Sequence, residues 1–209
     1  MNFEVVKPDE IEKRSFEIIT QELEEAGITI DEKNAFVIKR CIHTSADFDY
    51  AKTLMFSDGA VEKMKQLISE GAYIVTDTNM ALAGINKAKL ESHGGKALCF
   101  MADEEVAKEA KQRGVTRATV SMERASKLDK KVIFAVGNAP TALIKLHEMM
   151  EEGIFKPDFV IGVPVGFVNV VWAKELFLNS DVPYIINSGR KGGSNIAAAI
   201  CNAVLYQMV

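Results

Sequence analysis

Five short apolar runs, spaced along the chain from residue 72 onward, constrain the fold more than any other feature of the sequence. They are AYIVT (72–76), ALCFM (97–101), VIFAV (132–136), FVIGV (159–163) and YIINS (184–188). Each run is apolar on both faces, as strands of a parallel sheet are when helices cover both sides. Helices are predicted between or after these runs, at 103–114, 140–153, 169–180 and 194–208. The alternation predicts an α/β fold, a three-layer doubly wound sandwich with a five-stranded, mostly parallel, flavodoxin-like sheet.

The first 70 residues follow a different pattern, because three helices are predicted before the first apolar run. They span 8–27, opened by Pro8 and closed by Gly27, then 31–47, with Asp31 as N-cap, and 57–71. Helices that precede the first strand must pack on the sandwich or reach over its rim. We therefore expect a single domain over 1–209, with N-terminal helices in 1–70 packed on the rim of a sandwich formed by 71–209.

Composition and motifs exclude several classes of protein. The net charge of −4 and the lack of a Lys/Arg-rich run argue against a nucleic-acid partner. No apolar run approaches the ~18 residues of a membrane span, and the start MNFEVVKPDE is too acidic for a signal peptide. Cys41, Cys99 and Cys201 form no CxxC pair, so a cytoplasmic protein is expected. No HExxH motif, Cys/His cluster or GxSxG elbow occurs, so we expect neither a metal nor a cofactor.

The loops that follow four of the predicted strands are the candidate site, because open α/β sheets bind ligands beyond the carboxyl ends of their strands. They read TDTNMALAGI, GNAPTAL, GVPVGFVN and GRKGGSN, and are rich in Gly, Pro, Asn and Thr, which let backbone amides approach a ligand. Any one such loop is explained by ordinary turn chemistry, whereas four together favour a large ligand. The side chains that they offer are Asp77, Asn79, Asn138, Thr141, Phe167, Arg190, Lys191 and Ser194.

Two of these loops leave alternatives open. Arg190 and Lys191 precede Ser194, a candidate N-cap, so GRKGGSN is suited to a phosphate or carboxylate. A solvated turn with chance basic residues explains it equally well, and its spacing matches neither GxGxxG nor a P-loop, so a nucleotide is not specifically indicated. Asp77 is suited either to orienting a ligand or to capping the helix that follows it.

The stretch RCIHTSAD (40–47) places Arg40, His43 and Asp47 on one face of a predicted helix. From the residues alone, a surface trio is the simpler interpretation. An imidazole in such a setting is nevertheless suited to moving a proton, because its ordinary pKa lies close to neutrality.

Six motifs, taken in order, resemble one family, the precorrin-8X/cobalt-precorrin-8 methylmutases of cobalamin biosynthesis. They are RSF (14–16), RCIH (40–43), TDTNMALAGI (76–85), GNAPTAL (137–143), GVPVGFV (162–168) and GRKGGSN (189–195). They span nearly the whole chain. The sequence TDTNMALAGI resembles that of the anaerobic, cobalt-containing branch of the family more than that of the aerobic branch.

This resemblance implies a flavodoxin-like methylmutase, usually a homodimer, that moves a methyl group from C-11 to C-12 of a corrinoid to give cobyrinate. It implies that His43 donates or accepts a proton and that Ser15 and Arg40 contact the substrate. Protonating a ring atom polarises the conjugated macrocycle, which a methyl shift requires. The substrate's many carboxylates would explain Arg40, Arg190 and Lys191, and Phe167 and Met80 are suited to lining its faces.

Two rival functions and one question of assembly remain at this stage. A non-catalytic corrinoid carrier would typically show a DxHxxG motif, which is absent, and a sugar-phosphate or nucleotide enzyme would leave PVGFV and His43 unexplained. The last predicted helix, 194–208, is apolar around most of its circumference. It is either buried on both sides by its own chain or part of a dimer contact, and we expect the dimer contact.

Overall fold

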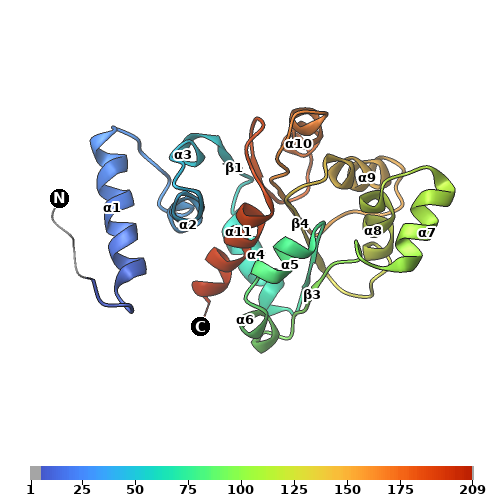
Figure 1. Ribbon diagram of the computed structural model, residues 1–209, viewed down its shortest axis with the longest axis horizontal. Helices are drawn as coiled ribbons and strands as arrows, with labels where there is room; N and C mark the ends of the chain where they lie inside the picture. Colours follow the sequence, from blue (N-terminus) through green and yellow to red (C-terminus); the bar gives the residue numbers. More distant parts are fainter. Residues whose placement is uncertain (1–5, 209) are drawn as a thin grey trace.

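A six-stranded sheet runs through the molecule with helices on both faces (Figure 1). The structure is a computed structural model and describes residues 6–208. The strands are β1 (Leu54–Phe56), β2 (Tyr73–Thr76), β3 (Ala97–Leu98), β4 (Val132–Val136), β5 (Phe159–Gly162) and β6 (Tyr184–Asn187). Their order in the sheet is β1-β6-β5-β4-β2-β3, and β2 to β6 pair in parallel.

Eleven helices are found among the described residues. They are α1 (Ile11–Glu25), α2 (Ala35–Ser45), α3 (Tyr50–Thr53), α4 (Ala60–Ser69), α5 (Asn79–Gly84), α6 (Lys87–Ser92), α7 (Glu104–Arg113), α8 (Arg117–Ala125), α9 (Pro140–Glu151), α10 (Val170–Leu178) and α11 (Ser194–Tyr206).

Both faces of the sheet are buried, which explains the continuous apolar runs. All five residues of β4 are buried, and successive ones belong to different cores. Ile133 packs with α2, α4 and α11 on one face, whereas Phe134 packs with α8, α9 and α10 on the other. The α/β prediction is therefore confirmed.

The number of strands differs from the prediction, because the sheet has six strands rather than five. The additional strand, β1, lies in the segment before residue 70 and pairs antiparallel with β6, Met55 opposite Ile186. A strand of only three residues at the sheet edge, one of them exposed, is too short to show an alternating hydrophobic pattern in the sequence. The predicted strand at 97–101 shrinks to Ala97–Leu98, since the chain leaves the sheet edge there.

The helix boundaries also differ in places. Helix α2 begins at Ala35 rather than after Asp31, because the Asp31 carboxylate accepts from the Lys33 amide and the Asn34 side chain in a preceding turn. Helices α3, α6 and α8 were not predicted, and α5 was expected only as a helix that follows Asp77. None of the helices within 6–208 has the length and apolar character to cross a membrane.

Helix α11 is buried by its own chain, which corrects the expectation of a dimer contact there. It packs against α2 on one side and against α5 and the sheet on the other. Nine of its residues are buried. Its apolar circumference therefore needs no second copy of the chain.

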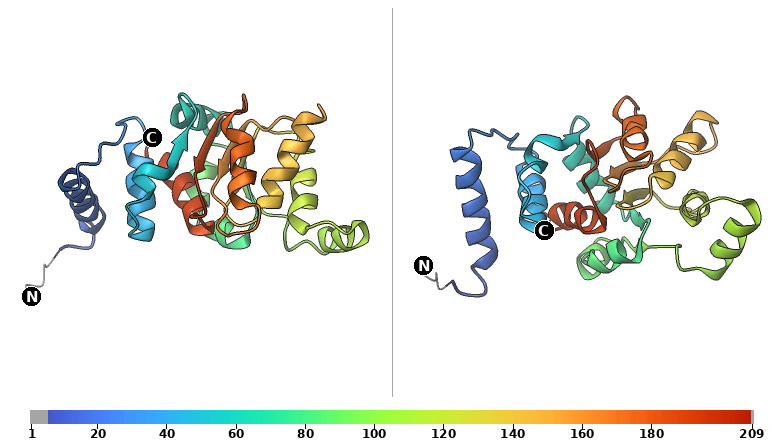
Figure 2. Two further views of the ribbon diagram at one scale, coloured as in Figure 1. Left: turned by 90° about the horizontal axis from the view of Figure 1, so that it is seen from above. Right: turned by 45° about the horizontal axis from the view of Figure 1, so that its top comes forward.

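Helix α1 lies at one end of the molecule, opposite α7, in all three views (Figures 1 and 2). It packs mainly on α2 and buries Ile19 and Leu23 there. Ile11 and Ile18, in contrast, are 51 % and 36 % exposed. Much of the apolar surface of α1 is therefore uncovered.

Candidate functional site

The carboxyl ends of the parallel strands define the candidate site. Numbered among themselves along the chain, β2 to β6 lie in the order 2-1-3-4-5, so the winding reverses between β2 and β4. Sheets of this order bind ligands at that reversal, beyond the carboxyl ends of the strands. The loops that meet there are 77–78 after β2, 137–139 after β4, 163–169 after β5 and 188–193 after β6.

Asp77 joins two of these loops from beneath. Its carboxylate accepts from the amides of Gly137 and Asn138, both at 2.8 Å, and from the amide of Ala139. Its side chain is fully buried. Burial raises the pKa of this carboxyl, and the three amide donors oppose that shift. Asp77 therefore shapes the floor of the site, out of reach of a ligand.

Two glycines allow the loops to approach one another. A Cβ on Gly137 would lie 2.7 Å from the Cα of Ser194, and a Cβ on Gly192 would lie 2.0 Å from the Val163 carbonyl oxygen. The hydroxyls of Thr78 and Ser194 are 2.7 Å apart, and Thr78 also accepts from the Ala81 amide as the N-cap of α5. Thr78, and not Asp77, therefore caps this helix.

The loop after β6 carries two cations with different environments. The Lys191 ammonium lies 2.6 Å from the carboxylates of both Asp47 and Asp49. These two hydrogen bonds raise the pKa of Lys191 and tie the end of α2 to the loop. The Arg190 guanidinium lies 5.2 Å from the centroid of the Phe167 ring and makes no ion pair within the described residues. Arg190 therefore remains available to an anion.

The loops 77–78, 137–139, 163–169 and 188–193, with the first turns of the helices that follow them, form the surface called the rim below. Large apolar side chains are exposed on it. Phe167 is 80 % exposed, and Val168 and Met80 are nearly as exposed. Asn79 and Asn138 are exposed beside them in sequence, after β2 and β4. Exposed aromatic and aliphatic side chains next to polar groups are typical of a surface that binds a partly apolar ligand.

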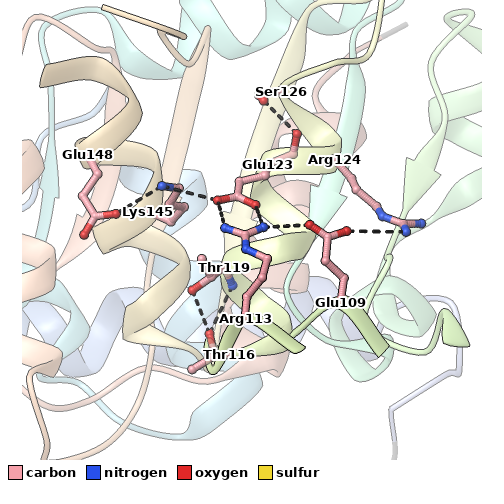
Figure 3. Close-up of polar contacts among 9 residues, drawn as sticks. All are labelled: Glu109, Arg113, Thr116, Thr119, Glu123, Arg124, Ser126, Lys145 and Glu148. Atoms are coloured by element: carbon pink, nitrogen blue, oxygen red, sulfur yellow. Dashed lines mark hydrogen bonds and ion pairs between the residues drawn. The ribbon is translucent and has the colours of Figure 1, made fainter. Parts of the chain in front are cut away.

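A network of ion pairs fixes helices α7, α8 and α9 beside this rim (Figure 3). Arg113 donates to Glu109 and Glu123, and Lys145 lies 3.4 Å from Glu123 and from Glu148. Exposed pairs of this kind contribute little stability singly.

The start of α8 lies against the start of α9. The hydroxyl of Thr116, the N-cap of α8, is 2.9 Å from that of Thr141 in the first turn of α9. Arg117, the next residue, is exposed and has no ion-pair partner in the described part of the chain. This places a second available cation near the loop after β4.

A separate cluster joins α1 to α2. Arg40 is 7 % exposed, and its guanidinium makes two hydrogen bonds to the Glu12 carboxylate, of 2.8 and 2.7 Å. It also lies 4.9 Å from the Phe16 ring centroid. The hydrogen bond from Arg40 lowers the pKa of Glu12. Arg40 therefore anchors α1 onto α2.

His43 is exposed next to this anchor. Its ring meets the edge of Phe16, with centroids 5.6 Å apart. The half-buried Ser15 donates to the Ile11 carbonyl at 2.8 Å. Asp47 does not join Arg40 and His43, because its carboxylate is bound by Lys191. This link instead ties the segment that follows α2, one turn after His43, to the loop after β6.

The predicted site residues thus fall into three groups. Asn79, Asn138, Phe167 and Arg190 are exposed on the rim, with Thr141 and Ser194 half-buried behind them. Ser15 and His43 lie at the junction of α1 and α2. The third group is held by other groups of the chain. Asp77 is buried, so a ligand cannot reach it. Arg40 and Lys191 already have carboxylate partners.

Three residues that shape these two regions were missed. Arg117 begins an unpredicted helix, and Glu12 gave no signal beyond that of an exposed helix residue. Lys174 of α10 is 1 % exposed, and its ammonium donates to the carbonyls of Gly189 and Lys191, both at 2.8 Å. Burial lowers the pKa of Lys174 to about 8. The sequence signal for Lys174 was the presence of a lysine within the otherwise apolar helical pattern of 169–180.

Comparisons with known proteins agree with one another. The family model described as precorrin-8X methylmutase matches residues 10–207. The chain is 43 % identical over 199 residues to a cobalt-precorrin-8 methylmutase of Priestia megaterium, covering 95 % of this chain and 88 % of that protein. It is 40 % identical over 210 residues to the cobalt-precorrin-8 methylmutase of Salmonella typhimurium, covering 98 % and 97 %. A crystal structure of precorrin-8X methyl mutase from Thermus thermophilus superposes with a TM-score of 0.83 at 37 % identity, over 94 % of this chain and 96 % of the other.

Proposed function

We propose that this chain, which belongs to the precorrin-8X methylmutase family, is an isomerase that moves a methyl group from C-11 to C-12 of cobalt-precorrin-8 to give cobyrinate. The observation that carries the proposal is the match of the family model over residues 10–207, which includes every candidate site residue named above. The rim geometry supports it, because exposed apolar side chains lie beside Arg190, which makes no ion pair within residues 6–208, and such a surface is suited to a flat macrocycle that carries carboxylates.

In this proposal His43 moves the proton. It donates to a ring atom, which makes the conjugated system electron-poor, so the methyl group migrates with its bonding pair to the neighbouring carbon. The ring then returns a proton as its double bonds rearrange, so substrate and product are isomers. His43 is suited to this role because its ring is exposed beside Phe16, on the helix whose end is tied to the loop after β6 by Asp47 and Lys191.

The remaining groups bind or position. Arg190 binds a substrate carboxylate, and Arg117 binds a second one across the rim. Phe167 and Met80 contact the faces of the macrocycle, while Ser15, Asn79, Asn138, Thr141 and Ser194 supply hydrogen bonds. Arg40 and Lys191 act through their carboxylate partners: Arg40 holds the start of α1 on α2, and Lys191 holds the segment that follows α2. Asp77 keeps the amides after β4 in position.

Several finer statements belong to the same proposal. We assign residues 1–209 to one methylmutase domain, with N-terminal helices packed on an α/β sandwich. The strand order 2-1-3-4-5 supports a flavodoxin-like class to which β1 is added. We further propose a cytoplasmic homodimer without a nucleic-acid partner. The runner-up function, a non-catalytic corrinoid carrier, would use the same rim.

Anaerobic incubation with cobalt-precorrin-8, followed by absorption spectroscopy, tests the function. We expect the spectrum to change to that of the rearranged corrinoid. A chromophore that binds without changing would instead support the carrier, and a chromophore that does not bind would contradict both. A parallel incubation with metal-free precorrin-8X compares the two branches, and we expect faster conversion of the cobalt form.

A further inference from the structure

Lys174 is a buried cation for which the proposed reaction has no use. It lies on α10 beneath the loop after β6, and its ammonium is bound by carbonyl oxygens, with no carboxylate partner among residues 6–208. Burying a charge is costly unless it is paired and hydrogen-bonded, and this ammonium has hydrogen bonds to neutral groups only among the described residues. The cost of burying this cation suits a role in shaping the loop that it contacts.

The carbonyl groups of residues 189–191 in this loop are bound by other groups of the protein. Lys174 binds those of Gly189 and Lys191, and the Lys191 carbonyl also accepts from the Asn187 side chain at 2.8 Å. The carbonyl of Arg190 accepts from the Gly166 amide at 3.2 Å. Three successive carbonyls are thus fixed by donors from α10, β6 and the loop after β5.

This arrangement decides where the amides point. In a trans peptide the carbonyl of one residue and the N–H of the next point in opposite directions. No peptide bond within 6–208 is cis. The N–H groups of Arg190 and Gly192 must therefore point away from Lys174. The amides of Arg190, Lys191 and Gly192 donate to no acceptor in the described part of the chain.

We propose that Lys174 is a positioning residue, which holds the carbonyls of Gly189 and Lys191 inward so that the free amides of this loop and the Arg190 side chain face a substrate carboxylate. The proposal rests on the substrate site proposed above and specifies its anion-binding part. Successive free amides form a concave site for an anion. The buried ammonium adds a positive charge beneath it, which also favours a carboxylate.

Four variants test the proposal. Lys174→Met keeps the length of the side chain but removes the charge and both donors, and Lys174→Gln keeps a donor without the charge. Arg190→Ala reports whether the loop binds the corrinoid at all. Lys145→Met is the matched control, since Lys145 belongs to the ion network between α8 and α9 (Figure 3).

The measurements are the affinity for cobyrinate by absorption titration, and kcat with cobalt-precorrin-8 at saturation. We expect Lys174→Met to bind about tenfold to hundredfold more weakly, the effect of losing hydrogen bonds to a charged group, while kcat stays within about threefold. Lys174→Gln should lie between it and the original protein, and it serves as the test where the Met variant does not fold. Lys145→Met should bind normally.

A double variant separates positioning from an independent effect. If Lys174 acts through the loop, Arg190→Ala should weaken binding less in the Lys174→Met background than in the original protein. Strictly additive effects would overturn the proposal, as would normal affinity in both Lys174 variants while Arg190→Ala binds weakly. Normal affinity in Arg190→Ala as well would show that the substrate site itself lies elsewhere.

Discussion

Three cations near the candidate site are held by the chain itself. Arg40 is bound by Glu12, Lys191 by Asp47 and Asp49, and Lys174 by two backbone carbonyls. The lysine and arginine side chains that remain available near the rim are therefore fewer than the sequence suggests. This division matters for recognition, because a cation already paired gains less from a substrate carboxylate than an unpaired one.

His43→Asn tests the proton transfer. The variant keeps a polar side chain of similar size but cannot exchange a proton, so turnover of cobalt-precorrin-8 at saturation should fall by about 10²–10⁴-fold. The fold and the affinity for the corrinoid should be retained, since His43 is exposed and the rim loops are unchanged. Single-turnover absorption kinetics measures the rate.

His147→Asn is the matched control, because His147 lies on α9 against Phe177 and Glu151. Its turnover should be close to that of the original protein. A near-normal rate in His43→Asn would make His43 a surface residue of α2 and would refute the mechanism.

Only some of the residues proposed to contact a ligand could be predicted from the sequence. Arg190 and Phe167 were found because residues after a strand gather at one edge of a parallel sheet. The partners of Arg40 and Lys191 lie 28 and about 143 positions away in the chain, so nothing local in RCIH or GRKGGSN reveals them. Lys174 is identified by its burial, which depends on the loop above it.

At the scale of elements, the buried parallel strands were predicted best and the edges worst. A run such as 132–136 is apolar because both faces are covered, and that requirement is visible in the sequence. Strand β1 depends on the exposed edge of β6, and α5, α6 and α8 are six to nine residues long. Such short elements owe their stability to tertiary packing more than to their own pattern.

The attachment of α1 is an element whose stability can be tested. Glu12→Gln removes the charge that pairs with Arg40 and should loosen the amino-terminal half of α1. Because Glu12 is about half exposed, we expect a loss of about 0.5–1 kcal/mol, a two- to fivefold decrease in amide protection. Hydrogen exchange over 11–25, compared with β4, measures this local effect.

The pH dependence follows from the lowered pKa of Glu12, caused by its hydrogen bonds with Arg40. A carboxyl with a lower pKa in the folded state stabilises above its unfolded pKa of 4.5, and the effect is lost as the pH falls through the folded value. Glu17→Gln on the same helix is the control, since Glu17 pairs at 3.6 Å with Arg14, one turn away. Equal exchange in both variants would contradict the anchoring role of Glu12.

At the scale of the whole molecule, the uncovered face of α1 is the surface that a second copy of the chain would cover. Helix α1 packs mainly on α2 at one end of the molecule (Figure 2). Ile11 and Ile18 lie seven positions apart, which is two helical turns, so they share one exposed face. A helix with apolar residues on this face and a core contact on another is typical of an interface between chains.

The proposed homodimer can therefore be tested through α1. Light scattering at micromolar concentration should give twice the mass of the 209-residue chain, and Ile18→Asp should shift it toward the monomer, because a buried carboxylate at an apolar contact is costly. Ile154→Asp is the control: Ile154 is 68 % exposed, more than Ile18, but follows α9 far from α1 in the chain. The mass of Ile154→Asp should remain that of the dimer. A monomer mass for the original protein would refute the dimer, whereas a dimer mass retained in Ile18→Asp would place the contact on another surface, such as the exposed Trp172 of α10.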